Sequence, residues 1–260
     1  MPKVRDILLI LKKFFVGLNF NKRNQKVLSQ KYDDPFITDY VARKTLEARN
    51  QTTNLDFNVQ NYRYFIPFVF LSAEREISVL DFGGGAGYHF DSIENFLPHK
   101  ISNWTVVETK SMVESARRIQ VDRRLTFETS VGSLRDKAFD LVIASSSIQY
   151  CDSPQKILEQ LLEIEARYYF ITRMPIWERS TISVVQKSPL SSNGPGRQLY
   201  DLADGMVEYQ LTVLNRTTFE DYFKDKYKIV FRSLESGDVH NVDGQRISQY
   251  GYLFQRKEEN

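Results

Sequence analysis

From residue 77 onward, short apolar runs of the chain alternate with segments of helical periodicity. The apolar runs predict strands near 77–82, 103–108, 124–128, 139–144, 167–172, 228–234 and 249–255, and the periodic segments predict helices near 87–97, 111–120, 154–165 and 217–224. This alternation predicts an α/β domain with a doubly wound, mostly parallel sheet of seven strands. Because little chain separates the last two strands, we expect the last strand to be antiparallel.

Residues 21–76 predict helices ahead of this sheet. Asp34 and Pro35 are typical of an N-cap and a first helical residue, and the helix should continue to about Arg49. The aromatic segment 62–70 predicts a second helix with a break at Pro67. We expect residues 21–76 to form a lid or N-terminal extension, and residues 77–260 to form the main domain.

The helix expected at 111–120 has its own start signal. Ser111 and Glu114 have the spacing of a capping box, in which each residue bonds the backbone N–H of the other. Residues 188–196 are rich in serine, proline and glycine, and they predict a loop near the functional face.

Residues 3–18 combine basic and apolar positions, and we expect residues 1–20 to form a basic amphipathic helix. Lys12 and Lys13 interrupt the apolar run before the ~20 residues that a membrane span requires. No small-residue cleavage site follows, which argues against a signal peptide. Two interpretations remain: a helix in peripheral contact with anionic lipid, or a helix that packs on the domain or on a partner chain.

Composition narrows the class of protein. The 260 residues are 42% hydrophobic and carry a net charge of +2, so the chain can bury a large core and has no strongly basic surface for nucleic acid. Cys151 is the only cysteine, which excludes an intrachain disulfide and favours a reducing, cytoplasmic location. No His, Cys, Asp and Glu spacing suggests a metal site, and we expect no metal.

The strand expected at 77–82 runs into a glycine turn that opens a helix. Glycines at 83, 85 and 87 suit positive φ values and a close approach of a ligand to the backbone. A dinucleotide fingerprint counted from Gly83 and Gly85 would place Gly or Ala where this chain has Tyr88. The turn therefore predicts a nucleoside site of another kind.

The spacing Asp81-x-Gly83-x-Gly85-x-Gly87 resembles the first motif of class I S-adenosylmethionine-dependent methyltransferases, which have a Rossmann-like fold. The resemblance implies S-adenosylmethionine as the cofactor, with Asp81 at its methionine end and Gly83, Gly84, Gly85 and Gly87 against it. Glu108 ends the next strand, about 20 residues beyond the turn, where a carboxylate can accept both ribose hydroxyls. We expect Glu108 to bind the ribose.

A narrower resemblance covers residues 77 to the C-terminus. Gln149-Tyr150, Arg173-Met174-Pro175 and the closing segment 250–256 look like a family of methyltransferases associated with bacterial surface-polysaccharide and lipopolysaccharide synthesis. The chain departs from that family at Thr172 and Met174, and a Tyr-Pro-Trp segment expected near 195–215 is replaced. The resemblance implies O-methylation of a sugar or glycan precursor. Two alternatives stay open, a small-molecule methyltransferase unrelated to glycans and a non-catalytic scaffold.

Candidate contacts follow the expected strand ends, because ligands of such sheets bind there. Ser145 and Ser146 should line the cofactor cleft. Gln149 and Tyr150 could reach either the cofactor or the acceptor, unless Tyr150 only packs at the start of a helix. We count Gln149 among the cofactor contacts and Tyr150 among the catalytic candidates. Arg173 could clamp a carboxylate or phosphate on the acceptor, unless it pairs with an acid such as Glu178.

A general base is harder to place. His89 lies just after the glycine turn and is the best-placed histidine, although it could equally hydrogen-bond the cofactor or solvent. The Cys151 thiol has no base pattern nearby, and we expect it to be half-buried and inert.

Overall fold

The structure is a computed structural model of the chain, and it describes residues 27–29, 31–51, 64, 66–71, 76–199, 205–242 and 245–258. The helix expected at residues 1–20 lies outside the described residues, as do large parts of the expected N-terminal extension. Within the described ranges, no helix is long and apolar enough to cross a membrane.

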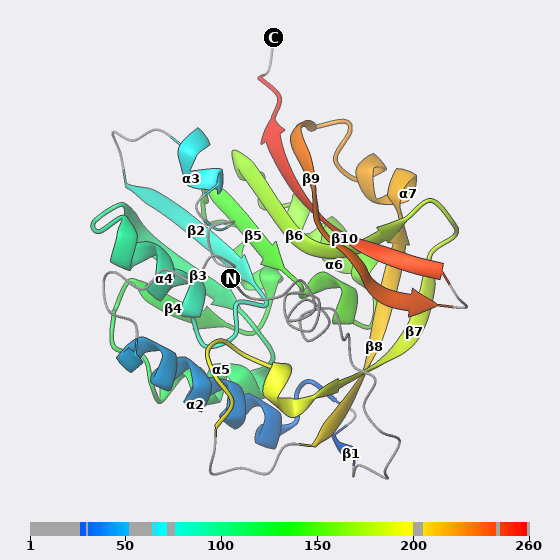
Figure 1. Cartoon of the computed structure of the whole chain (residues 1–260). Coiled ribbons are helices and arrows are strands. Elements are labelled where there is room, and N and C mark those ends of the chain that lie inside the picture. The colour runs from blue at the N-terminus through cyan, green and yellow to red at the C-terminus, as the bar shows by residue number, and fades with distance from the viewer. Residues whose placement is uncertain are drawn as a thin grey trace, which may run out of the picture.

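Seven strands form the central sheet in the order β4-β3-β2-β5-β6-β10-β9 (Figure 1). Their bounds are β2 (Ile77–Phe82), β3 (Ile101–Val107), β4 (Leu125–Glu128), β5 (Leu141–Ser145), β6 (Tyr168–Trp177), β9 (Tyr227–Val242) and β10 (Gln245–Arg256). The pairs from β4 to β6 are parallel, whereas β10 is antiparallel to both β6 and β9. The mostly parallel, Rossmann-like sheet with an antiparallel last strand is therefore confirmed.

Three further strands extend the sheet, and the prediction of seven strands omitted them. They are β1 (Val27–Ser29), β7 (Ile182–Pro189) and β8 (Met206–Asn215). β8 pairs in parallel with the end of β6. Its first residues pair in parallel with β1, and β7 pairs with it in antiparallel along its length. The signal was present in the sequence, because Val207, Tyr209, Leu211 and Val213 are buried apolar residues at every second position of β8.

Helices cover both faces of the sheet. α3 (Ile66–Phe70), α4 (Tyr88–Phe96) and α5 (Lys110–Arg117) pack on one face, and α6 (Pro154–Leu162) and α7 (Arg216–Asp221) pack on the other. Adjacent residues of β2 show the division, since Val79 belongs to the first core and Leu80 to the second, and both are fully buried. A third, smaller core joins α2 (Pro35–Gln51) to β8 and to the segment 190–199.

The start of α2 is as expected, because the Phe36 N–H donates to Asp34 Oδ1 at 2.9 Å. The capping box expected in α5 is wrong. Thr109 is the N-cap, its hydroxyl accepting the Met112 N–H, so Ser111 already lies inside the helix. The expected break at Pro67 is also wrong, because α3 begins at Ile66 and Pro67 takes the first turn, where its missing N–H costs no intrahelical bond.

Candidate active site

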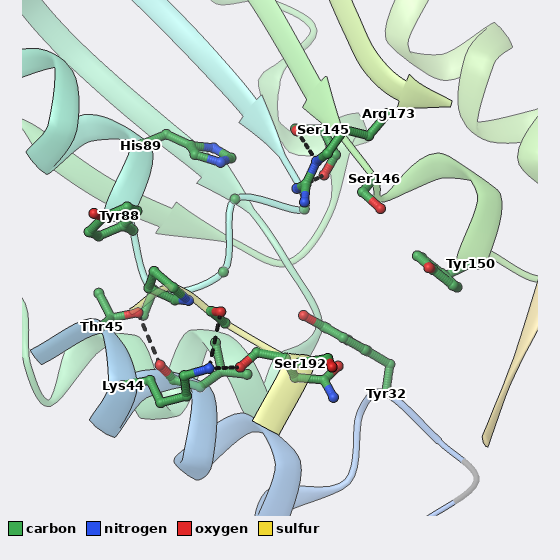
Figure 2. Close-up of a pocket in the computed structure, with 18 of the residues that line it drawn as sticks. Tyr32, Lys44, Thr45, Tyr88, His89, Ser145, Ser146, Tyr150, Arg173 and Ser192 are labelled. Carbon is green, nitrogen blue, oxygen red and sulfur yellow. Dashed lines mark hydrogen bonds between the residues drawn. The ribbon is translucent and has the colours of Figure 1, made fainter. Parts of the chain in front are cut away.

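A cavity of about 470 Å³ opens at the carboxyl ends of the central strands (Figure 2). The predicted residues that line it are Gly83, Gly84, Gly85, His89, Ser145, Ser146, Tyr150 and Arg173. Four other predicted residues, Asp81, Gly87, Glu108 and Gln149, do not line it. α2 and the segment 188–196 form the opposite wall.

The glycine turn is shaped to expose backbone. Gly83 and Gly85 have φ values of 72° and 59°, which L side chains rarely adopt. A Cβ on Gly83 would overlap Ser147, and one on Gly84 would overlap the Asp81 carboxylate. Gly87 serves packing instead, because a Cβ there would lie 2.6 Å from Leu125 Cδ2. The turn thus presents a bare backbone cradle to the cavity.

Asp81 lies directly behind this cradle and is fully buried. Its Oδ2 accepts the Trp104 indole N–H at 3.2 Å and lies 2.9 Å from His89 Nδ1. Its Oδ1 is buried and has no hydrogen-bond partner among the described residues. The sequence placed Asp81 at the methionine end of the cofactor, and the structure separates Asp81 from the cavity by His89 and Gly84. The free Oδ1 lone pairs fit a site that takes a cationic ligand group.

His89 faces the cavity between Asp81 and the Tyr64 ring, whose centroid is 4.2 Å from that of the imidazole. Burial alone would lower the pKa of His89, but the negative charge of Asp81 and the hydrogen bond to it raise that pKa to about 9. His89 is therefore a cation at neutral pH. An imidazolium cannot take a proton, so the structure argues against the predicted general base.

Glu108 lies beneath the glycine turn and is buried. Its Oε1 accepts the Gly85 N–H at 3.0 Å, and its Oε2 accepts the Thr109 N–H at 2.9 Å. Burial raises the pKa of Glu108 to about 7 against the lowering effect of these two bonds. Each carboxylate oxygen keeps a further lone pair, so Glu108 can hold the turn and still accept ribose hydroxyls.

Ser146 follows β5, whereas Arg173 lies within β6 and not after it as expected, and both have left-handed backbone conformations, with φ of 53° and 56°. Such conformations cost about 1–3 kcal/mol for residues other than glycine and cluster at functional sites. The Arg173 guanidinium donates from Nε to Ser145 Oγ at 3.0 Å and from Nη2 to the Ser145 carbonyl at 3.2 Å. It makes no ion pair with any described acid, and Glu178 pairs with Arg216 instead.

Gln149 and Ser145 support Arg173. Gln149 is buried, and its amide donates to Ser146 Oγ at 3.1 Å and to the Arg173 carbonyl at 3.2 Å. The Ser145 hydroxyl also lies 3.0 Å from the Tyr64 hydroxyl. Gln149 was predicted to contact the cofactor, whereas the structure has it hold the backbone of Arg173.

The end of the cavity near Tyr150 is aromatic and polar. The Tyr150 hydroxyl donates to Gln186 Oε1 at 2.8 Å, and its ring meets the Tyr209 ring edge-on at 6.1 Å. The Tyr32 ring packs edge-on against Tyr209 at 5.5 Å and lies across the cavity from Ser146 (Figure 2). Burial raises the pKa of Tyr150, so its phenol stays protonated.

The helix at 35–51 and the loop at 188–196 were expected from the sequence, but the Lys44 contact that joins them in the wall opposite the sheet was not. Lys44 of α2 is buried, and its ammonium donates to the carbonyls of Ser191, Asn193 and Gly194 (Figure 2). Gly194 has a φ of 73°, and a Cβ there would come within 3.3 Å of Val41. A lysine within a helix gives no sequence signal for such a contact, because most helical lysines are solvated.

Cys151 is partly buried, and its thiol is directed at the Ser147 carbonyl. Burial raises its pKa to about 12, which keeps it a thiol and fits the expectation of an inert residue. Across the described part of the chain, no three His, Cys, Asp or Glu side chains group as metal ligands.

Comparisons with known proteins agree with this geometry. Residues 80–164, which include the end of β2, the glycine turn, Glu108 and β5, match the family model described as a methyltransferase domain. A comparison with curated protein sequences gives no match. S-adenosylmethionine, the predicted cofactor, is therefore the cofactor of this domain, and the glycine cradle and the free Asp81 oxygen fit it.

Solved structures resemble this chain at low sequence identity. The [4+2]-cyclase SpnF is 12% identical with a TM-score of 0.52, covering 91% of this chain and 99% of its own. An S-adenosylmethionine-dependent methyltransferase from Clostridium acetobutylicum is 13% identical with a TM-score of 0.49, covering 82% of this chain and 98% of its own. The glycopeptide N-methyltransferase MtfA, complexed with S-adenosyl-L-homocysteine, is 12% identical with a TM-score of 0.45, covering 82% of this chain and 96% of its own.

Proposed function

We propose that the protein transfers a methyl group from S-adenosylmethionine to an oxygen of a sugar or glycan precursor, as in surface-polysaccharide synthesis. The observation that carries this proposal is the polarity of the cavity end near Tyr150. Hydroxyl and amide side chains crowd it beside the rings of Tyr150 and Tyr209, and they are Ser146, Gln186 and Asn193 with the two tyrosine hydroxyls. Such a set suits a polyhydroxylated acceptor that both hydrogen-bonds and packs on rings.

The cofactor would occupy the end formed by the glycine turn. Its bound form supplies a methyl group on a positively charged sulfur, which an acceptor oxygen can attack in line. The backbone of Gly83 and Gly84 offers close approach to it, and Glu108 would accept the ribose hydroxyls. Asp81 is near enough to lower the energy of a cationic group next to Gly84.

His89 would anchor the carboxylate at the methionine end. No Asp or Glu lines the cavity among the described residues, whereas the cations His89, Arg173 and Lys44 do, and the Lys44 ammonium already donates to three backbone carbonyls. The cofactor carries one carboxylate, and His89 is the cation beside the glycine turn. His89→Gln should therefore weaken S-adenosylhomocysteine binding about tenfold and leave 5′-methylthioadenosine, which lacks the carboxylate, unchanged in calorimetry. Equal loss for both ligands would exclude this role.

Arg173 would then take an anionic group of the acceptor. Its guanidinium donates to Ser145 and lies in the cavity wall between His89 and Ser146 (Figure 2). A planar fork can grip a phosphate or carboxylate with two bonds and thereby fix the acceptor hydroxyl in line with the methyl group. With His89 charged, alignment supplies the catalysis and the hydroxyl proton leaves to solvent.

Two experiments test the proposal. Purified protein with labelled S-adenosylmethionine should methylate members of a panel of nucleotide sugars and sugar phosphates, and should act poorly on their neutral parent sugars. Surface glycans from cells with and without the gene should differ by one methyl group in mass spectrometry. Methylation of non-sugar acceptors alone would favour the small-molecule alternative. Cofactor binding without transfer to any acceptor would favour the scaffold.

A further inference from the structure

The backbone that carries Arg173 is irregular in a specific way. Across the β6–β10 pair, Tyr252 lies opposite Ile171 and Tyr250 lies opposite Met174. Thr172 and Arg173 therefore face the single residue Gly251, which is the pattern of a β-bulge. Bulges bend a strand and re-aim a side chain, and here the side chain is that of Arg173.

A carboxylate from a more distant strand reaches this bulge. Glu235 belongs to β9, which is separated from β6 by β10. Its two oxygens accept the Thr172 hydroxyl and the Arg173 backbone N–H. Glu235 has left its own ladder, since Ser236 pairs with Gln249 and Leu234 pairs with Tyr250, with Glu235 between them.

Gly251 makes the crossing between the strands feasible. A Cβ on Gly251 would lie 2.5 Å from Glu235 Oε1 and 2.9 Å from Ser233 Oγ. Any other residue at 251 would therefore push the Glu235 carboxylate away from Arg173. Gly251 has no positive φ, so glycine is needed here to leave room for the Glu235 carboxylate and not for its backbone conformation.

The backbone carbonyl of Arg173 is held as well. It accepts the Gln149 amide, and the Arg173 N–H donates to Glu235, so side chains from both sides satisfy the backbone where the ladder is interrupted. We infer that Glu235, acting with Gln149 and admitted by Gly251, is a positioning residue that fixes the left-handed conformation of Arg173. That conformation directs the guanidinium to Ser145 and the cavity.

The inference rests on the proposed function only for what Arg173 binds. The geometric part concerns Arg173 alone and can be tested without any acceptor. The Arg173 Nε–H bond to Ser145 gives a direct signal, because its exchange with solvent slows while the bond is formed. The Arg173→Lys variant identifies the corresponding resonance in a nitrogen–proton spectrum by its loss.

In Glu235→Ala we expect the Arg173 Nε–H to exchange at least about tenfold faster than in the wild type. Gly251→Ala should show the same effect, since it displaces the same carboxylate. In Glu235→Gln the amide oxygen can accept the Arg173 N–H while the Thr172 hydroxyl turns to accept from the amide NH2, so both bonds survive and most of the protection should return. The matched control is Glu220→Ala: Glu220 binds Tyr252 and Arg232 of the same hairpin, so its loss should lower the melting temperature without changing Arg173 exchange.

Unchanged exchange in Glu235→Ala, or equal acceleration in Glu220→Ala, would overturn the inference. If Glu235→Ala does not fold, as judged by its amide spectrum, Glu235→Asp decides. Its shorter carboxylate should reach only one donor and accelerate exchange, and wild-type exchange there would refute the role. Absence of methyl transfer in the wild type would refute the proposed function and leave this result standing.

Discussion

The two ends of the cavity are built from the chain in different ways. The cofactor end comes from one continuous stretch, in which β2, the glycine turn and Glu108 follow each other within about 30 residues. The end near Tyr150 is assembled from α2, the end of β5, the bulge of β6 and the segment 188–196, which are far apart in sequence. Local geometry fixes the first end, and long-range contacts fix the second.

Because of this difference, we expect the two ends to respond differently to substitution. The glycine turn depends on backbone conformations that no neighbouring residue can restore, so a single side chain there should abolish the site. The Tyr150 end depends on networks of hydrogen bonds through Gln149, Lys44 and Gln186, which should lose affinity and specificity in steps.

Gly83→Val should have the largest effect. Its Cβ would overlap Ser147 and its φ of 72° is unfavourable for valine, so we expect S-adenosylhomocysteine affinity to fall by at least about 100-fold in calorimetry. Gly132→Ala is the control, because its Cβ meets nothing closer than 3.4 Å and should leave affinity unchanged. Near-normal binding by Gly83→Val would show that the turn is not the cofactor cradle.

Glu108→Ala should weaken S-adenosylhomocysteine binding by roughly 1–3 kcal/mol, or about 5- to 150-fold, since both the ribose and the turn lose a buried acceptor. The comparison variant is Glu163→Ala, which removes a surface ion pair with Arg135 and should bind normally. If the two variants bind alike, Glu108 has no part in the site.

Arg173→Lys should act only at the acceptor end. Loss of the planar fork with retention of charge should lower kcat/KM for an anionic acceptor by about 10- to 100-fold while cofactor affinity stays within about twofold. Steady-state kinetics with the acceptor found in the methylation panel measure this. A joint fall in cofactor affinity and thermal stability would instead indicate a structural role.

The pH response of His89 should be the smallest effect. Its folded pKa of about 9 lies above the ordinary value of 6.5, so its pairing with Asp81 stabilises the fold fully below pH 6.5 and is lost as pH rises through about 9. The melting-temperature advantage of the wild type over His89→Gln should shrink across that range. A constant advantage from pH 6 to 10 would show that the pair is not ionic.

The central sheet could be predicted because its strands are short apolar runs bounded by turn residues. The glycine turn could be predicted because its spacing is local. The sequence-level prediction missed β7 and β8, although the alternation at Val207 to Val213 was visible. It could not place Glu235 beside Arg173, since nothing local to residue 235 reports a bulge two strands away. For the same reason it could not show that the Gln149 amide holds the backbone of Arg173.

A calorimetric titration of S-adenosylhomocysteine into the wild type, Gly83→Val and Arg173→Lys tests the division of the cavity most directly. We expect one molecule bound per wild-type chain, the same affinity in Arg173→Lys and no measurable binding in Gly83→Val, with no heat from NAD in any of them. Failure of the wild type to bind, or equal loss in both variants, would contradict a cofactor end that is separate from the acceptor end.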